Sequence, residues 1–193
     1  MDLWPEVPIQ MGALKNKVVI KLAIELEKTI YSNAKHVIAL SPGMEEGVLR
    51  FPFMKGKTSM VPNMSKPDIF YPRIRNHGIA LKFDISESHF NVVHFGAMGI
   101  ANGLEYIIKA ALIAKELGND IKFHFFGTGQ MEKSLKEFSD RNALNNVLFH
   151  GPLPMNVLSD CVNNCDASLV SFANFPILQT NSPNKLFDSL SAG

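Results

Sequence analysis

Short apolar runs alternate with segments of helical period along the chain from about residue 89 onward. The apolar runs, the first three of which end at a glycine, are residues 91–95, 121–126, 147–150 and 167–172. Apolar residues three and four apart predict helices at residues 104–117, 131–141, 155–164 and 183–192. Strands that are apolar throughout are typical of parallel sheets covered on both faces. The pattern therefore predicts an α/β fold with a doubly wound parallel sheet.

The first third of the chain has a different pattern. A helix of about four turns is predicted at residues 17–32, where apolar residues recur at spacing four: Leu22, Leu26 and Ile30. Short strands are predicted at residues 34–40 and 58–61. Ser41-Pro42 follows the first of them and predicts a helix N-terminus, because serine caps free N–H groups and proline suits the first helical position.

Residues 65–88 have no sustained period and are interrupted by proline, glycine, asparagine and serine, which is typical of a linker. We therefore divide the chain into three parts. Residues 1–64 form a first segment, residues 65–88 form the linker, and residues 89–193 form the domain with the parallel sheet.

Composition and charge exclude several classes of protein. The hydrophobic share of 46% supports a globular core, and a net charge of +1 without a long Lys/Arg run predicts no nucleic-acid partner. The first residues lack the pattern of a signal peptide, and no apolar run approaches the roughly 18 residues of a membrane span. The two cysteines, Cys161 and Cys165, have the spacing of neither a common zinc site nor a redox pair. We interpret them as buried free thiols in a reducing cytoplasm.

The loops after the strands are the candidate binding loops, because ligands of open parallel sheets bind at the carboxyl ends of the strands. Residues 96–103 contain three glycines, and Gly127-Thr-Gly129 follows the second strand. Glycines allow a ligand to approach the backbone closely, and the helix after the first loop offers free N–H groups to a phosphate. Ordinary tight turns are the alternative for both loops. The candidate ligand-binding residues here are Gly96, Met98, Gly99, Asn102, Gly127 and Gly129.

The last predicted helix offers a further group of candidates. Ser182 is placed to cap this helix, with Pro183 at its first position and Asn184 in its first turn. Lys185 in the same turn opposes the helix dipole unless an anion neutralises both. Asp188 lies three residues later on the same side. We predict that Lys185 binds phosphate and Asp188 binds ribose hydroxyls; an exposed Lys–Asp pair is the alternative.

Three histidines lie near the ends of neighbouring predicted strands: His94, His124 and His150. Three imidazoles there could bind zinc. However, side chains alternate between the faces of a strand, and the carboxylates that orient zinc-bound histidines are not evident nearby. We therefore predict no metal and interpret the histidines as packing residues.

Several segments together resemble the retaining GT-B glycosyltransferases of family GT4. The residues 34–41 (AKHVIALS) resemble the end of that family's first domain, and Val61-Pro-Asn63 with Phe70-Tyr-Pro72 resembles its crossover into the second. The strand ends at Gly96, Gly127 and Gly151 match that second domain, and the residues 183–193 match its terminal Pro-x-Lys…Glu…Ala-Gly helix. The resemblance implies a nucleotide-sugar-binding domain at 89–193, truncated at its C-terminus and preceded by the tail of an acceptor domain.

Three segments are similar to a subgroup, the bacterial surface-polysaccharide transferases related to N-acetylfucosamine transferases: 2–6 (DLWPE), 96–104 (GAMGIANGL) and 182–185 (SPNK). That resemblance implies a UDP-linked deoxy or N-acetylamino sugar as donor substrate and a polyprenyl-diphosphate-linked acceptor. It also implies a cytoplasmic enzyme in peripheral contact with the inner membrane, with no bound metal or other cofactor.

The chain departs from the family at four positions. Ala97 and Asn102 stand where many members have Arg and Lys that touch the diphosphate, and Thr180 and Asp188 stand where the family has two glutamates. The resemblance assigns no catalytic residue in this chain.

Three functions therefore remain open. The first is glycosyl transfer from a nucleotide sugar. The second is a truncated, non-catalytic nucleotide-binding module. The third, an unrelated Rossmann-type oxidoreductase, is disfavoured because the dinucleotide fingerprint is not found.

Overall fold

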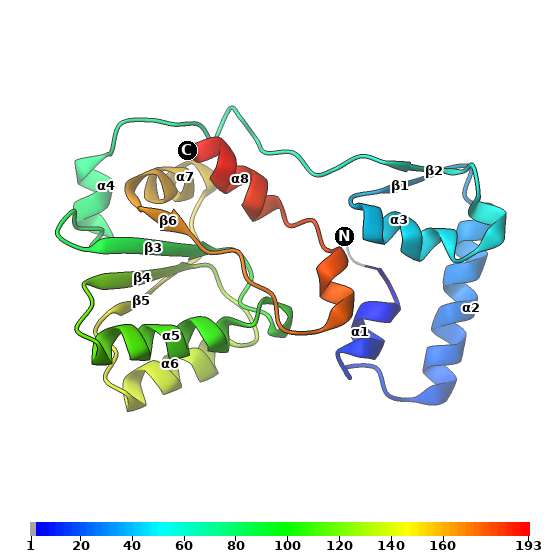
Figure 1. Ribbon diagram of the computed structural model, residues 1–193, viewed down its shortest axis with the longest axis horizontal. Helices are drawn as coiled ribbons and strands as arrows, with labels where there is room; N and C mark the ends of the chain where they lie inside the picture. The colour runs from blue at the N-terminus through cyan, green and yellow to red at the C-terminus, as the bar shows by residue number, and fades with distance from the viewer. Residues whose placement is uncertain (1–2) are drawn as a thin grey trace. The chain divides into compact units, whose positions relative to one another are not determined.

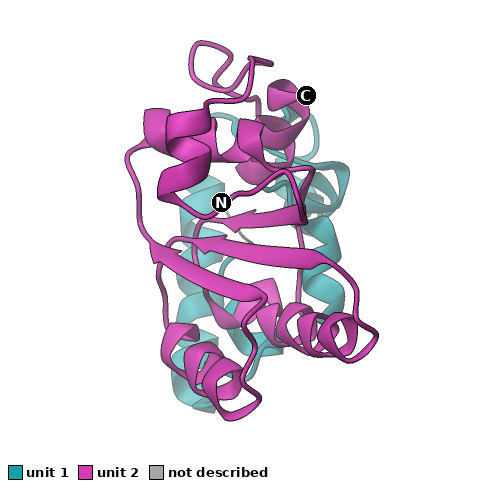
Figure 2. Cartoon of the chain, turned by 90° about the vertical axis from the view of Figure 1, so that its left-hand side faces the viewer, with its two compact units in different colours: residues 1–63, 174–183 teal, residues 64–173, 184–193 magenta. Residues whose placement is uncertain are grey.

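The computed structural model describes residues 3–193, which form two compact units (Figure 2). Unit 1 comprises Met1–Asn63 and Asn174–Pro183, and unit 2 comprises Met64–Ala173 and Asn184–Gly193. Asp2, which begins the N-terminal motif of the subgroup resemblance, lies outside the described residues.

Unit 1 is built around a parallel pair of short strands, β1 (Val37–Ala39) and β2 (Thr58–Met60). Its helices are α1 (Glu6–Gln10), α2 (Lys17–Asn33), α3 (Pro42–Leu49), η1 (Pro52–Met54) and η3 (Pro176–Thr180). The predicted N-terminus of α3 is confirmed, since the Ser41 hydroxyl accepts a hydrogen bond from the N–H of Met44, with Pro42 in the first turn. The predicted helix at 17–32 is also confirmed.

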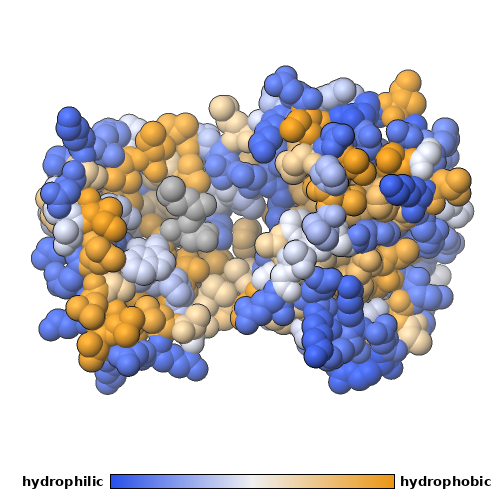
Figure 3. Space-filling view, turned by 180° about the vertical axis from the view of Figure 1, so that it is seen from behind, coloured by the Kyte–Doolittle hydropathy of each residue, from blue (hydrophilic) through white to orange (hydrophobic). Residues whose placement is uncertain are grey.

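The apolar stripe of α2 lies on the surface of unit 1. The buried residues of this helix are Ala23 and Glu27, and Glu27 pairs with Arg50. The stripe at spacing four is exposed over at least half of each side chain: Val18, Leu22, Leu26 and Ile30. Figure 3 shows apolar side chains exposed on the face of the molecule that it draws. The period of apolar residues therefore predicted the helix correctly. Within unit 1, however, the apolar face of α2 is exposed.

Unit 2 contains a four-stranded sheet in the order β5-β4-β3-β6, with all strands parallel (Figure 1). Its strands are β3 (Phe90–Phe95), β4 (Ile121–Phe126), β5 (Val147–Gly151) and β6 (Ala167–Ser168). Its helices are α4 (His77–Lys82), η2 (Ile100–Asn102), α5 (Leu104–Glu116), α6 (Glu132–Arg141), α7 (Met155–Asn164) and α8 (Asn184–Ala192).

Helices cover both faces of this sheet. Figure 1 shows α5 and α6 on one face and α4, α7 and α8 on the other. The alternation along each strand explains the two cores: Val92 and Phe123 pack in the core that contains α5 residues, whereas Val93 and Phe126 pack in the core that contains α7 residues. The predicted doubly wound parallel sheet is confirmed.

The predicted linker belongs to unit 2. Within residues 65–88 the chain forms α4, and three apolar side chains enter the core on the α7 face: Phe70, Phe83 and Ile85. The contacts divide the chain after Asn63, and residues 174–183 group with unit 1 although they lie within the segment assigned to the second domain. Isolated aromatic residues between prolines give no period, yet each of them can fill a core.

Strand β6 is shorter than the predicted run of 167–172. Its ladder to β3 ends at Ser168, after which the chain turns toward the loop that follows β3. The N–H of Ala173 donates to the carbonyl of Ala101, and the Ser171 hydroxyl donates to the carbonyl of Asn102. Residues 171–173 thus support the loop at residues 96–103, the glycine loop. Across residues 3–193, no helix combines the length and apolar character that a membrane span requires.

Candidate functional site

The loops that follow β3 and β4 pack against each other, backbone to backbone. The N–H of Gly96 donates to the carbonyl of Phe126 at 2.8 Å, and the N–H of Met98 donates to the carbonyl of Thr128 at 2.9 Å. The carbonyl of Met98 in turn accepts from the N–H of Met131 at 2.9 Å. The two loops therefore continue the pairing beyond the ends of the strands and are held in one conformation.

This packing explains the two glycines after β4. A β-carbon on Gly127 would lie 1.9 Å from the carbonyl oxygen of Gly96, and one on Gly129 would lie 2.6 Å from the carbonyl oxygen of Met98. Gly127 also has a φ of 135°, which side chains rarely adopt. Loop packing alone thus requires glycine at both positions, and their contact with a nucleotide stays a prediction.

The backbone N–H groups of the glycine loop that are free to bind a ligand are not all those of the predicted residues. The N–H groups of Gly96 and Met98 are already bonded to the β4 loop, and the Met98 side chain is fully buried in the core. Among the hydrogen bonds of residues 3–193, none uses the N–H of Ala97 or of Gly99. The open donors are therefore at Ala97, which sequence reasoning missed, and at Gly99. The alternation of bonded and open N–H groups along this loop depends on its pairing with the loop after β4, so the sequence alone could not identify Ala97.

Helix α8 offers a better N-terminus for an anion than α5 does. Glu105 occupies the first turn of α5, where its carboxylate complements the helix dipole and would repel a phosphate. The first turn of α8 has no acidic residue and contains Lys185. The prediction that the helix after the glycine loop offers N–H groups to phosphate is thus less favourable than the prediction for α8.

Lys185 reaches from α8 to the glycine loop. Its Nζ lies 3.7 Å from the place that a β-carbon on Gly96 would occupy and donates to Asn102 Oδ1 at 3.3 Å. Across residues 3–193 it has no carboxylate within ion-pair distance. Burial lowers the pKa of Lys185 to about 8. A partly buried ammonium without a counter-charge favours the binding of an anion at this point.

Asn102 connects Lys185 to the loop. Its Oδ1 accepts from Lys185, while its Nδ2 donates to the carbonyl of Ala97 at 2.8 Å. The two bonds fix the orientation of the amide, since only Nδ2 can donate to a carbonyl. The predicted site residues Gly96, Gly99, Asn102 and Lys185 are therefore brought together.

The other α8 candidates lie differently from their predictions. The helix begins at Asn184, so the residue before it is Pro183 and Ser182 is not its N-cap. Asn184 is exposed, and Ser182 belongs to unit 1, where its carbonyl accepts from the Asn63 side chain. Asp188 is only 6% exposed, and its Oδ1 accepts from the N–H of Lys66 at 3.4 Å. Asp188 therefore contacts the segment that follows unit 1 along the chain, and its ribose contact stays a prediction.

His94 lies beside Lys185 at the end of β3. It is 1% exposed, and neither ring nitrogen makes a hydrogen bond within the part of the chain that the structure describes. Burial and the Lys185 charge lower the pKa of His94 to about 4, against a weaker opposing effect of the Leu169 and Ala97 carbonyls. The imidazole is therefore neutral at pH 7 and leaves Lys185 as the cation of the site.

His124 and His150 form a separate polar chain within the sheet. His124 Nδ1 lies 3.0 Å from His150 Nε2, and His124 Nε2 lies 3.1 Å from Asn91 Oδ1. Asn91 Nδ2 continues the chain to Asp166. Within residues 3–193, no group of three His, Cys, Asp or Glu side chains could hold a metal ion. Since His94 does not join this chain, the three histidines do not form one cluster.

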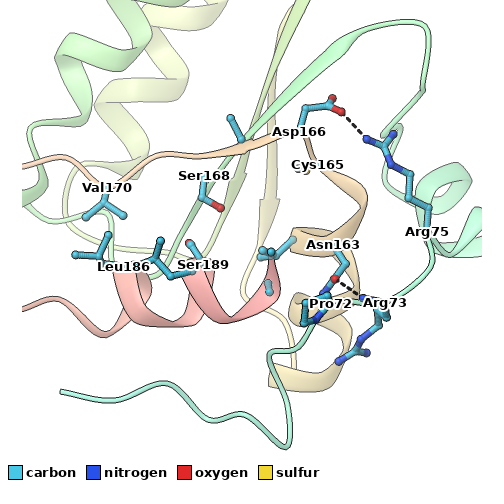
Figure 4. A pocket seen from close by; sticks show the side chains of 15 residues that line it. Pro72, Arg73, Arg75, Asn163, Cys165, Asp166, Ser168, Val170, Leu186 and Ser189 are labelled. Atoms are coloured by element: carbon cyan, nitrogen blue, oxygen red, sulfur yellow. Dashed lines mark hydrogen bonds and ion pairs between the residues drawn. The ribbon is translucent and has the colours of Figure 1, made fainter.

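A cavity in unit 2 lies elsewhere. It has a volume of about 700 Å³ and lies along β6, with residues of α7, α8 and the segment 72–75 around it (Figure 4). Arg75 and Asp166 form an ion pair at its edge, and Leu186 and Ser189 project from α8. None of the donor-binding candidates lines this cavity. It is a hollow beside the open edge of the sheet, whereas the buried cation lies at the end of β3.

Comparisons with known proteins agree with this fold. A sequence profile described as glycosyl transferases group 1 matches residues 81–177, just over half of the chain. No curated protein matches the sequence. A sucrose-phosphate synthase from Thermosynechococcus elongatus has a TM-score of 0.73 and 16% identity over 96% of this chain and 46% of its own.

Two further solved structures are similar. WaaG, a glycosyltransferase involved in lipopolysaccharide biosynthesis, has a TM-score of 0.73 and 14% identity over 100% of this chain and 52% of its own. Anabaena HepE in complex with UDP and glucose has a TM-score of 0.65 and 17% identity over 84% of this chain and 44% of its own. The chain thus spans about half the length of the structures it matches. The predicted α/β fold of GT-B type is confirmed.

Proposed function

This chain belongs to the glycosyl transferases group 1 family, and on that basis we propose that it carries the donor-binding part of an enzyme that transfers a sugar from a nucleotide sugar. The observation that supports this proposal most is Lys185, a partly buried cation that has no carboxylate partner among residues 3–193 and lies at the carboxyl end of β3. A nucleotide sugar carries a diphosphate, whose charge such a cation can offset.

The proposed roles follow from where charge develops in the reaction. When the bond between the anomeric carbon and the diphosphate oxygen breaks, the leaving diphosphate gains negative charge. Lys185 would offset this charge, and the N–H groups of Ala97 and Gly99 would donate to the phosphate oxygens. Asp188 would accept hydrogen bonds from the ribose hydroxyls. The transfer is proposed to retain the configuration of the anomeric carbon, as the resemblance to GT4 implies.

The proposed donor is UDP-linked and carries a deoxy or N-acetylamino sugar. Support for the base comes from HepE, a similar structure solved with UDP and glucose. Support for a role in surface polysaccharide assembly comes from WaaG, which is involved in lipopolysaccharide biosynthesis. The proposed acceptor is a saccharide linked to polyprenyl diphosphate.

An acceptor of this kind requires a cytoplasmic enzyme in peripheral contact with the inner membrane. The exposed stripe of α2 supports such contact, because apolar side chains there alternate with exposed lysines: Lys17, Lys21 and Lys28. We expect the chain to sediment with vesicles that contain anionic lipid and Leu22→Glu to weaken this binding. Equal sedimentation of the two proteins would remove this support.

The donor proposal is tested by calorimetry with UDP. Lys185→Met keeps an unbranched side chain and removes the charge, and we expect it to lower UDP affinity about tenfold or more. Lys109→Met is the matched control, because Lys109 is exposed on α5 and lies outside the proposed site. Equal UDP affinity of the wild-type protein and Lys185→Met would show that Lys185 does not bind the diphosphate.

A second candidate function is nucleotide binding without transfer. It requires only the donor-binding residues named above, none of which is assigned to catalysis. UDP binding without release of UDP from a UDP-sugar in the presence of acceptor would support this function. Turnover would exclude it.

A further inference from the structure

The further inference concerns Asn102, whose amide lies between the Lys185 ammonium and the carbonyl of Ala97. Asn102 is also bonded through its backbone, since its N–H donates to Gly99 and its carbonyl accepts from the Ser171 hydroxyl. The Oδ1, Nδ2, N–H and carbonyl groups of Asn102 therefore each make a hydrogen bond. The residue is held rigidly, and its Oδ1 occupies a defined place beside Lys185 Nζ.

The chemistry of this contact matters because an amide is neutral. An amide oxygen orients an ammonium through one hydrogen bond without cancelling its charge, whereas a carboxylate at the same place would form an ion pair. An ammonium has three donors, and Asn102 is its only hydrogen-bond partner among residues 3–193. Two N–H donors of the Lys185 ammonium, which lies next to Gly96, therefore stay available for a ligand.

We propose that Asn102 is a positioning residue that holds the Lys185 ammonium against the glycine loop while leaving its charge uncompensated for the diphosphate of the donor. This inference rests on the proposed function and adds a residue to it. In this arrangement Asn102 also links the ligand to the loop, because the same amide that orients Lys185 fixes the carbonyl of Ala97. The N–H of Gly99, one of the two open donors of the loop, lies on the turn that Asn102 closes.

The decisive variant is Asn102→Asp, which replaces the amide nitrogen by oxygen and adds one negative charge. A carboxylate at this place would pair with Lys185 and offset its cation. We expect UDP and inorganic pyrophosphate each to bind about tenfold more weakly or worse, because the new carboxylate offsets the cation and the bond from Nδ2 to the Ala97 carbonyl is lost. Asn119→Asp is the control, because it makes the same change at an exposed turn after α5.

A second readout distinguishes positioning from a structural role. An ion pair raises the pKa of a lysine, so the pH above which pyrophosphate affinity falls should move upward in Asn102→Asp. An unchanged pH profile overturns the assignment of Asn102.

The outcomes also separate this inference from the proposed function. If the wild-type protein binds neither UDP nor pyrophosphate, both are wrong. If the wild-type protein binds both ligands and Asn102→Asp binds them equally well, donor binding stands and the role of Asn102 is overturned.

Discussion

A β-carbon on Gly127 would lie 1.9 Å from the carbonyl oxygen of Gly96, so the loops after β3 and β4 fit together only when the second loop begins with glycine. The contact is between backbone atoms, which cannot move aside without breaking the hydrogen bonds from Gly96 to Phe126 and from Gly127 to Gly151. The packing of these two loops at the proposed donor site therefore requires glycine at position 127.

We expect Gly127→Ala to destabilise unit 2 by about 2–4 kcal/mol, because it combines steric overlap with an unfavourable φ. Gly118→Ala is the matched control, since Gly118 also has a positive φ but has no atom within 4 Å of its β-carbon position. The free energy of unfolding in urea measures both. Equal destabilisation by the two variants would show that backbone strain, and not the contact with Gly96, requires the glycine.

The charge of Lys185 gives a prediction for pH. Since burial lowers the pKa of Lys185 to about 8, the ammonium loses its proton as pH rises through that value. We expect UDP affinity to fall between pH 7 and pH 9, when calorimetry is done at constant ionic strength. Lys185→Met should show no such fall. A flat profile for the wild-type protein would mean that the cation does not take part in binding.

Asp188 is tested by comparing two ligands. If its carboxylate binds ribose hydroxyls, Asp188→Asn should weaken UDP binding by about three- to tenfold and leave pyrophosphate binding unchanged, because pyrophosphate has no ribose. A fall in the affinity of both ligands would indicate a change in α8 as a whole. Unchanged UDP affinity together with a lower melting temperature would assign Asp188 to its contact with the N–H of Lys66 alone.

The buried histidines predict a loss of stability in mild acid. Burial lowers the pKa values of His94 and His124 from 6.5 to about 4. Between these values the unfolded chain binds more protons than the folded chain, so stability falls as pH decreases from about 6.5 toward 4. Because neither nitrogen of His94 has a hydrogen-bond partner among the described residues, His94→Leu should reduce the slope of stability against pH and raise stability at pH 6. Urea unfolding at several pH values measures this, and an unchanged slope would contradict it.

The sequence could predict most of the sheet because each strand and helix of unit 2 carries its own period. The run at 121–126 matches β4, and the helix at 155–164 matches α7. Strand β6 was predicted too long because the apolar run continues where the chain leaves the sheet to support the loop at Asn102. A run of apolar residues shows that a segment is buried, and it does not show what the segment is buried against.

The candidate site was predictable in part for the same reason. Placement at the carboxyl ends of parallel strands follows from topology, so Gly96, Gly99, Asn102 and Lys185 could be named before their contacts were known. The buried side chain of Met98, the N–H of Ala97 and the place of Ser182 outside α8 could not, because each depends on where a neighbouring segment lies.

By itself, then, the sequence determined the alternation of strands and helices, the parallel sheet and the edge of the sheet that carries the candidate loops. Those features depend on the period of apolar residues and on glycine and proline, which act locally. Only the tertiary structure decided that Lys185 has a neutral amide and, among residues 3–193, no carboxylate beside it, and that Gly127 is required by the backbone of Gly96. Such facts join residues far apart in the chain, and hydrogen bonds, burial and steric overlap between distant residues exist only once the chain has folded.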